Sequence, residues 1–272
     1  MPPSKRIDVL VVVKAAPVIT SDLDETVCVA AVSADSGLWV RLHPVPFRDL
    51  VDDSKFKKYQ RITVDVIPHK TDRRPETVSP IHGTIQPGEY IRSNHQWAAR
   101  RPWIECVGER LMCDLVRENR GGSGPGVTSL AVVRPESPPK LVITPRDPQQ
   151  VNKWKSRAEV AAASPSLFDD PTVTKVPYEV VPWRFKYRYK CQADGCGGHE
   201  QTIVDWEAVA YWHRVRRSDH WQQSMIDKFE RELWTKRDSV LFVGNMEQHP
   251  WDFLVLGVFW PPQTATQAAF RL

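Results

Sequence analysis

Short apolar runs separated by turn-forming residues dominate the first half of the chain. Most of them are rich in β-branched residues, and they are bounded by Pro, Gly, Asp or Ser, a pattern typical of β-strands. The runs occupy residues 9–13, 25–32, 38–42, 61–67, 128–133 and 141–144. Asp35-Ser36-Gly37 separates the second run from the third and predicts a hairpin connection. Residues 101–117 instead repeat apolar side chains at helical spacing, which predicts one amphipathic helix.

This order of elements favours an OB-like β-barrel in residues 1–145, because that fold consists of short strands separated by turns. A two-sheet sandwich is the alternative. Residues 146–177 are polar and contain several prolines and serines, and we interpret them as a linker or a surface arm. Residues 178–272 predict a smaller α/β domain. Its expected elements are a strand at 183–190, helices at 201–217 and 219–236, and strands at 240–243 and 253–259.

A group of metal-binding side chains follows the strand at 183–190. Cys191, Cys196 and His199 lie within nine residues, and glycines between them let the chain fold back on itself. Thiolates and imidazole on one ion indicate zinc, and a closed structural zinc site has four ligands. We expect His249, in the loop between the last two strands, to be the fourth. If water takes that position instead, the site is catalytic and Glu200 is the obvious general base.

The remaining cysteines have no second ligand near them in the sequence. Cys106 and Cys113 are seven positions apart, so both fall on one face of the predicted helix. We interpret them, and Cys28 within its strand, as core residues. The predicted fold class is therefore α+β, with a β-rich N-terminal part and a smaller C-terminal α/β region clipped by one zinc ion.

Aromatic and basic residues alternate along residues 183–190. Side chains of a strand alternate between its faces, so the aromatic set should pack in the core and the basic set should face water or phosphate. A merely solvated basic face is an equally good interpretation. The candidate nucleic-acid-binding residues are Arg184, Lys186, Arg188 and Lys190 on this strand, and Arg41, Arg48, Arg73 and Arg74 in the first domain.

A metal-dependent nuclease is the alternative function, and it would use the Cys/Cys/His centre or a magnesium site at Asp205 and Glu207. These two carboxylates are two positions apart on a predicted helix and do not face each other. The negative charge of Asp205 would also stabilise the N-terminus of this helix through the helix dipole. Structural roles are therefore favoured, and the sequence favours a binding protein over an enzyme. A protein-interaction scaffold is a further alternative.

Composition narrows the class of protein. The chain has 272 residues, with 41% hydrophobic and 26% charged residues, as expected for a soluble globular protein. The net charge of +4 is compatible with nucleic-acid binding without establishing it. No apolar segment reaches membrane-spanning length, and the five cysteines are interpreted as reduced thiols or metal ligands. We expect a cytoplasmic protein that does not contact a membrane.

Several stretches resemble a family of uncharacterised bacterial proteins described as containing two OB-like barrels and found among defence or conflict genes. They are Thr26–Ala31, Trp39–Arg48, Asp72-Arg73-Arg74-Pro75-Glu76, and Cys191–His199 continuing to Asp205-Trp206-Glu207. The chain departs from the family pattern at His43, where an aromatic residue is expected. The resemblance implies a nucleic-acid-binding sensor or adaptor, with possible protein partners in a defence assembly or a role in DNA or RNA transactions.

Overall fold

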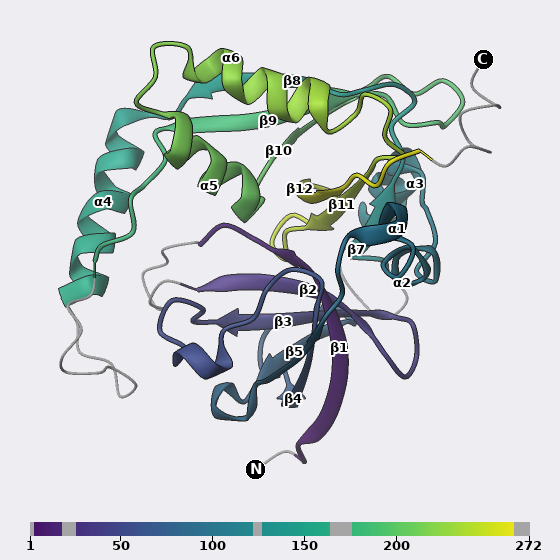
Figure 1. The fold of residues 1–272 in the computed structure, drawn as a ribbon, viewed down its shortest axis with the longest axis vertical. Coiled ribbons are helices and arrows are strands. Elements are labelled where there is room, and N and C mark those ends of the chain that lie inside the picture. Colours follow the sequence, from purple (N-terminus) through teal and green to yellow (C-terminus); the bar gives the residue numbers. More distant parts are fainter. Residues whose placement is uncertain (1–2, 18–25, 122–126, 164–175, 264–272) are drawn as a thin grey trace.

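The computed structural model describes residues 3–17, 26–121, 127–163 and 176–263. A β-barrel formed by the N-terminal strands lies at the bottom of Figure 1, and two small sheets with their helices lie above it. This arrangement confirms the predicted α+β class, with an OB-like barrel followed by an α/β region.

The strands cover most of the apolar runs predicted from the sequence. They are β1 (Lys5–Lys14), β2 (Val27–Ser33), β3 (Trp39–Val45), β4 (Gln60–Pro68), β5 (Thr77–Pro80), β6 (Gln86–Tyr90), β7 (Leu130–Val133), β8 (Lys140–Pro145), β9 (Trp183–Tyr189), β10 (His199–Thr202), β11 (Val240–Asn245) and β12 (Phe253–Phe259). The helical elements are η1 (Asp52–Ser54), η2 (His82–Thr84), α1 (Asn94–Trp97), α2 (Arg101–Glu105), α3 (Met112–Asn119), α4 (Pro148–Ala163), α5 (Trp206–Val215), α6 (Trp221–Ile226) and the π-helical η3 (Asp227–Glu232).

The first five strands close into a barrel. Their order is β1-β2-β3-β5-β4, and β4 pairs with β1 to complete the circle. All of these pairings are antiparallel except that of β3 with β5, which is parallel. The expected hairpin at residues 35–37 joins β2 to β3, and Gly37 adopts the positive φ of 66° that favours glycine there.

Strand β1 is buried on both of its faces, which explains its nearly continuous apolar sequence. Val9 and Val11 point into the barrel, whereas Leu10 and Val12 pack against strands of the C-terminal region. Each such side chain contributes about 1.5–3 kcal/mol when it is fully buried. The barrel is therefore joined to the rest of the protein through a shared hydrophobic core.

The C-terminal region contains two three-stranded sheets, ordered β10-β9-β8 and β12-β11-β7. Ile203, which follows β10, forms an isolated β-bridge with Val255 of β12 and so connects the two sheets. Strands β7 and β8, which the sequence placed with the N-terminal barrel, pair instead with β11 and β9. Their partners lie far along the chain, so strand pattern alone gave no basis for assigning them.

Four expected segments differ in detail from the structure. The helix predicted at 101–117 is divided into α2 and α3, with Gly108 at a φ of 69° between them. The helix predicted at 201–217 begins only at Trp206, because residues 199–202 form β10 against β9. The helix predicted at 219–236 is α6 followed by η3. The predicted linker at 146–177 includes the sixteen-residue helix α4, and its residues 164–175 lie outside the described residues.

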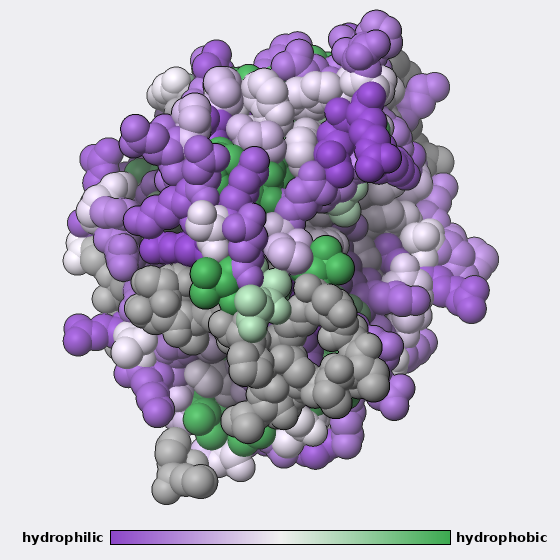
Figure 2. Space-filling view, turned by 90° about the vertical axis from the view of Figure 1, so that its left-hand side faces the viewer, coloured by the Kyte–Doolittle hydropathy of each residue, from purple (hydrophilic) through white to green (hydrophobic). Residues whose placement is uncertain are grey.

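Figure 2 shows the side of the molecule from which α4 projects at the left of Figure 1. Hydrophilic residues cover most of this face, and the hydrophobic patches on it are small. Among the helices that the structure describes, none combines the length and apolar character needed to cross a bilayer.

Candidate metal centre and barrel cleft

Four metal-binding side chains converge where α3 meets the β9–β10 hairpin. The ligand atoms of Cys113, Cys191, Cys196 and His199 all lie within 4.8 Å of one another. The Cys191 Sγ atom is 3.6 Å from the Cys113 Sγ atom and 3.7 Å from the Cys196 Sγ atom. The His199 Nε2 atom is 3.5 Å from the Cys113 Sγ atom and 3.3 Å from the Cys196 Sγ atom.

These separations fit a tetrahedral zinc site. Zinc–sulfur bonds of about 2.3 Å and zinc–nitrogen bonds of about 2.1 Å place tetrahedral ligands about 3.8 Å (S to S) and about 3.6 Å (S to N) apart. A disulfide would need about 2.05 Å between sulfur atoms, and the cysteines are free thiols. The cluster can therefore hold a metal ion such as zinc.

The hairpin supplies three of the four ligands through its local geometry. His199 pairs with Tyr189 in the register of β9 and β10, so the chain must reverse direction between them. Gly195 and Gly198 make that reversal possible with φ values of 68° and 100°. Cys113 comes from α3, on a distant part of the chain. A bound ion would thus tie α3 to the hairpin.

The surroundings influence the protonation of three of the ligands. Burial raises the pKa of the Cys113 thiol to about 12, and hydrogen bonds with Cys191 and Cys196 add to this effect. Burial also acts to raise the pKa of Cys196, but backbone hydrogen bonds from residues that include Gly198 outweigh it and lower that pKa. Burial lowers the pKa of His199, which favours the neutral imidazole that metals require.

One sequence-based expectation about this centre needs correction. Cys113 completes the cluster in place of His249, whose ring lies 5.9 Å from that of Trp251 in the loop after β11. Glu200, which was considered as a general base only if water took the fourth position, is paired with Lys186 and Arg188 at 2.7 Å each. Hydrogen bonds from these two cations lower the pKa of Glu200.

The alternation along β9 has the structural consequence expected from the sequence. Phe185, Tyr187 and Tyr189 are buried in the core of the C-terminal region. The opposite face carries the basic residues, of which Arg188 and Lys190 are exposed and Arg184 and Lys186 are half-buried. Because Glu200 neutralises part of this face, the strand is less cationic than its sequence indicates.

The other predicted arginines gather at the barrel. Arg41 is buried and donates hydrogen bonds to both oxygens of Ser129, whereas Arg74 binds Asp72 and the backbone oxygen of Asn245. These contacts join the barrel to β11 and to the residue before β7. Arg73 is exposed. Arg41 and Arg74 therefore help to hold the two parts of the protein together, a role that the sequence did not indicate.

A cleft of about 380 Å³ opens at this junction. Arg41 and His43 of β3, Arg74 of the β4–β5 loop and His249 are among its lining residues. Three buried polar atoms of lining residues have no hydrogen-bond partner among the described residues: Arg41 Nε, His43 Nδ1 and Asn245 Oδ1. Burial, with the charges of neighbouring groups, lowers the pKa of His43 to about 4. The cleft thus has hydrogen-bonding capacity that the described residues do not use.

A second cavity, of about 290 Å³, adjoins the cleft and shares Ala15 with it. Its basic residues are Lys14, Arg48 and Lys55, and its aromatic residues are Phe47 and Trp206. The Lys14 ammonium lies 3.9 Å from the centre of the Phe47 ring. Burial lowers the pKa of Lys14 to about 8. Basic and aromatic side chains are therefore combined at the end of the barrel where β1 ends and β2 begins.

The carboxylates considered for a nuclease have structural partners. Asp205 caps α5 by accepting a hydrogen bond from the backbone nitrogen of Glu207, as expected for an acidic residue at that position. Lys58 forms an ion pair with Glu207 at 2.8 Å. Burial raises the pKa of Asp205 to about 7, although Lys58 acts in the opposite direction.

Comparison with known families identifies both halves of the chain. A model described as "Domain of unknown function (DUF8757)" matches residues 109–272, which is more than half of the chain. A second, "Domain of unknown function (DUF8758)", matches residues 5–106, the segment that contains the barrel and α2. No curated protein matches the chain.

Proposed function

We propose that this chain, which belongs to the family of the domain of unknown function DUF8757, is a nucleic-acid-binding protein with a structural zinc site. The observation that carries the proposal is a pair of adjoining cavities on an OB-like barrel, of which the larger is lined by residues of β2 and β3 and the smaller adjoins it where β1 ends and β2 begins. OB-folds bind oligonucleotides on the β2–β3 face of the barrel, between the β1–β2 and β4–β5 loops.

The chemistry of the two cavities suits single-stranded nucleic acid. Proteins of this kind combine cations that neutralise phosphates with aromatic rings on which bases stack. Arg48 and Lys55 are exposed at the smaller cavity, and Phe47 and Trp206 are half-buried there. Arg48 donates a hydrogen bond to the Val176 backbone oxygen, and Lys55 pairs with Asp52 at 2.9 Å, so phosphates would compete with these contacts. Arg73 adds an exposed cation on the β4–β5 loop. A strand following these residues would run from the smaller cavity past Ala15 into the cleft.

The zinc ion would act by fixing structure. The four ligands complete a closed coordination shell, whereas a catalytic zinc keeps one position for water or substrate. Of the three carboxylates considered for a nuclease, Glu200 and Glu207 each have a cationic partner, and Asp205 caps α5. These contacts favour a binding protein over a nuclease. A role as sensor or adaptor in a defence assembly rests on the sequence resemblance.

Fluorescence anisotropy with labelled oligonucleotides tests the proposal. The double variant Arg48→Ala/Lys55→Ala removes two exposed cations of the barrel. It should weaken the binding of single strands and reduce the log–log salt dependence by about 1.4, since each contact to a single strand contributes about 0.7. The matched control, Arg188→Ala/Lys190→Ala, removes two exposed cations of the zinc hairpin and should leave binding unchanged.

Each outcome decides the proposal. Loss of binding in the control variant would move the site to the zinc hairpin and contradict the barrel as the binding surface. Absence of binding by the zinc-loaded wild-type protein at low salt would overturn the function itself. The comparison of DNA, RNA and duplex probes identifies the preferred strand.

A further inference from the structure

A third cavity lies in the C-terminal region, among α5, η3 and β12. Its volume is about 350 Å³, within the range of small-molecule sites. It shares no lining residue with the two barrel cavities. Its walls are formed largely by apolar and aromatic side chains, namely Ala210, Phe229, Leu233, Val258, Tyr211 and Trp260.

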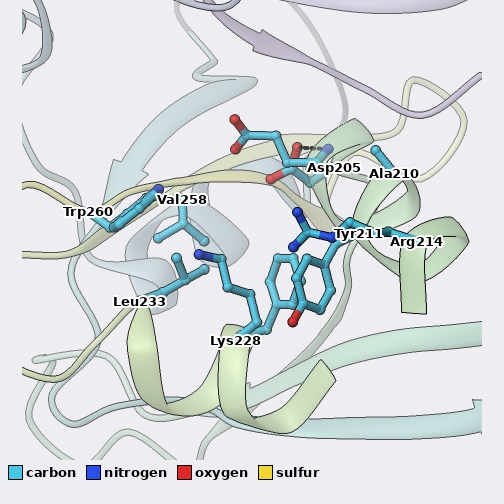
Figure 3. Close-up of a pocket in the computed structure, with 10 residues that line it drawn as sticks. Asp205, Ala210, Tyr211, Arg214, Lys228, Leu233, Val258 and Trp260 are labelled. Atoms are coloured by element: carbon cyan, nitrogen blue, oxygen red, sulfur yellow. Dashed lines mark hydrogen bonds between the residues drawn. The ribbon is translucent and has the colours of Figure 1, made fainter. Parts of the chain in front are cut away.

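Two cations project into this cavity. Figure 3 shows the ends of Arg214 and Lys228 directed into one space between Trp260 and Tyr211. Lys228 also pairs with Glu232 on η3. In the part of the chain that the structure describes, Arg214 has no carboxylate partner and only the ring of Tyr211 beneath it, at 4.6 Å. A positive charge is thus available for an anionic ligand.

Aromatic rings flank the cations. The Lys228 ammonium lies 4.9 Å from the centre of the Trp260 ring, and Arg237 lies 5.0 Å from the same ring. Trp260 and Tyr211 both line the cavity, and aromatic rings provide stacking surfaces for nucleobases. The carboxylates Asp205 and Glu207 also line the cavity, and Glu207 is paired with Lys58 at 2.8 Å.

The backbone of η3 gives an independent indication of a site. The Leu233 nitrogen donates to the Lys228 oxygen, five positions earlier, which is the π-helical pattern. π-helical turns are rare and occur frequently at functional sites. Here the turn includes Lys228 and Phe229 and ends at Leu233, all three of which line the cavity.

We propose that this cavity binds a nucleoside monophosphate, with its base against Trp260 and its phosphate at Arg214 and Lys228. The phosphate accepts charge-assisted hydrogen bonds from the two cations. The apolar walls formed by Leu233 and Val258 exclude water from the base. This site is separate from the oligonucleotide-binding surface proposed on the barrel and does not depend on it.

Calorimetric titration of the full-length, zinc-loaded protein with AMP, GMP, CMP and UMP tests the site. At least one nucleotide should bind, and the corresponding nucleoside and inorganic phosphate alone should each bind more weakly. Arg214→Ala should weaken nucleotide binding by at least about tenfold. Arg217→Ala is the matched control, because Arg217 is exposed three positions later and does not line the cavity.

Further variants separate this site from the barrel and from effects on folding. Lys228→Gln removes the second cation and should also weaken nucleotide binding, with an unchanged melting temperature as the check on folding. The barrel variant Arg48→Ala/Lys55→Ala should bind nucleotides as the wild type does. The proposal is overturned if no nucleotide binds at millimolar concentration, or if Arg214→Ala and Lys228→Gln bind nucleotide as tightly as Arg217→Ala.

Discussion

Replacing Cys113 by serine should weaken the link between α3 and the zinc hairpin. Cys113 is the only ligand of the four-residue cluster that does not come from the β9–β10 hairpin. In the variant, zinc held by the three hairpin ligands no longer ties α3 to them. The free energy of unfolding of the zinc-loaded protein should therefore fall.

The size of the effect follows from the length of chain that the metal closes. Cys113 and Cys191 are 78 positions apart. A cross-link over a loop of that length lowers the entropy of the unfolded chain by an amount worth about 4.5 kcal/mol at 25 °C. Cys191 and Cys196 are only five positions apart, and a link between them corresponds to about 2 kcal/mol in the same treatment. Loss of the longer link should lower the melting temperature of a 272-residue chain by roughly 8 °C.

Thermal unfolding followed by circular dichroism, with zinc content measured on the same samples, provides the assay. Cys106→Ser is the matched control, because Cys106 is an exposed thiol outside the cluster. His249→Ala tests the ligand expected from the sequence. Both controls should retain zinc and melt as the wild type does, and a chelator should remove most of the difference between wild type and Cys113→Ser.

Two results would refute this reasoning. If Cys113→Ser melts like Cys106→Ser at full zinc loading, Cys113 does not bind the ion. Loss of zinc in His249→Ala, with zinc retained in Cys113→Ser, would restore the ligand set expected from the sequence.

Three further substitutions test other parts of the structure. The pKa of His43 is lowered to about 4 in the folded protein, so the unfolded chain takes up the proton first as the pH drops. The free energy of unfolding should therefore fall between about pH 6.5 and 4, by at most about 3 kcal/mol. Urea denaturation at pH 7 and 4.5 should show a smaller decrease for His43→Phe than for the wild type, and an equal decrease would exclude His43 as the cause. The Arg74 side chain is 10% exposed, and Asp72→Asn leaves it without its carboxylate partner. This variant should lower the free energy of unfolding by about 3–5 kcal/mol in the same assay at pH 7, whereas a loss below about 1 kcal/mol would count against this ion pair. Tyr187→Phe removes a buried hydrogen bond to the Phe229 oxygen and should lower the free energy of unfolding by about 1–3 kcal/mol; no change would indicate that water replaces the hydroxyl.

Local pattern was sufficient for most strands of the barrel and insufficient for two of them. The apolar runs of β1, β2, β3 and β4 are visible in the sequence because their side chains fill a core. Strand β5 ends in Pro80, and β6 contains Pro87 and Gly88 at the edge of the sheet. Such residues are disfavoured in strand interiors, so only the pairing with β4 reveals these strands.

Helical periodicity located α2, α3, α5 and α6 but not their ends, and it missed α4 within the predicted linker. The apolar spacing continues across Gly108, where the backbone turns away from the helix. Residues 199–202 match a helix as well as a strand, and their pairing with β9 decides between the two. Tertiary hydrogen bonds thus override local preference in these segments.

The metal centre shows the same division between local and distant information. Three ligands lie in one short stretch, and their spacing indicated a metal site. Cys28, Cys106 and Cys113 are equivalent in sequence, since none has a ligand nearby. Only the packing of α3 against the hairpin distinguishes Cys113 from the other two. The sequence therefore indicated a cysteine as the fourth ligand only by combining a three-ligand motif with cysteines that had no assigned role.

The salt dependence of oligonucleotide binding tests the central claim most directly. Lys14, Arg48, Lys55 and Arg73 lie on or beside the proposed barrel surface. Three to four phosphate contacts predict a log–log slope of about −2 to −3 for a single strand. Anisotropy titrations of the zinc-loaded protein between 50 and 200 mM salt would measure it. A slope in that range supports nucleic-acid binding at the barrel, and a slope near zero, or no binding, contradicts it.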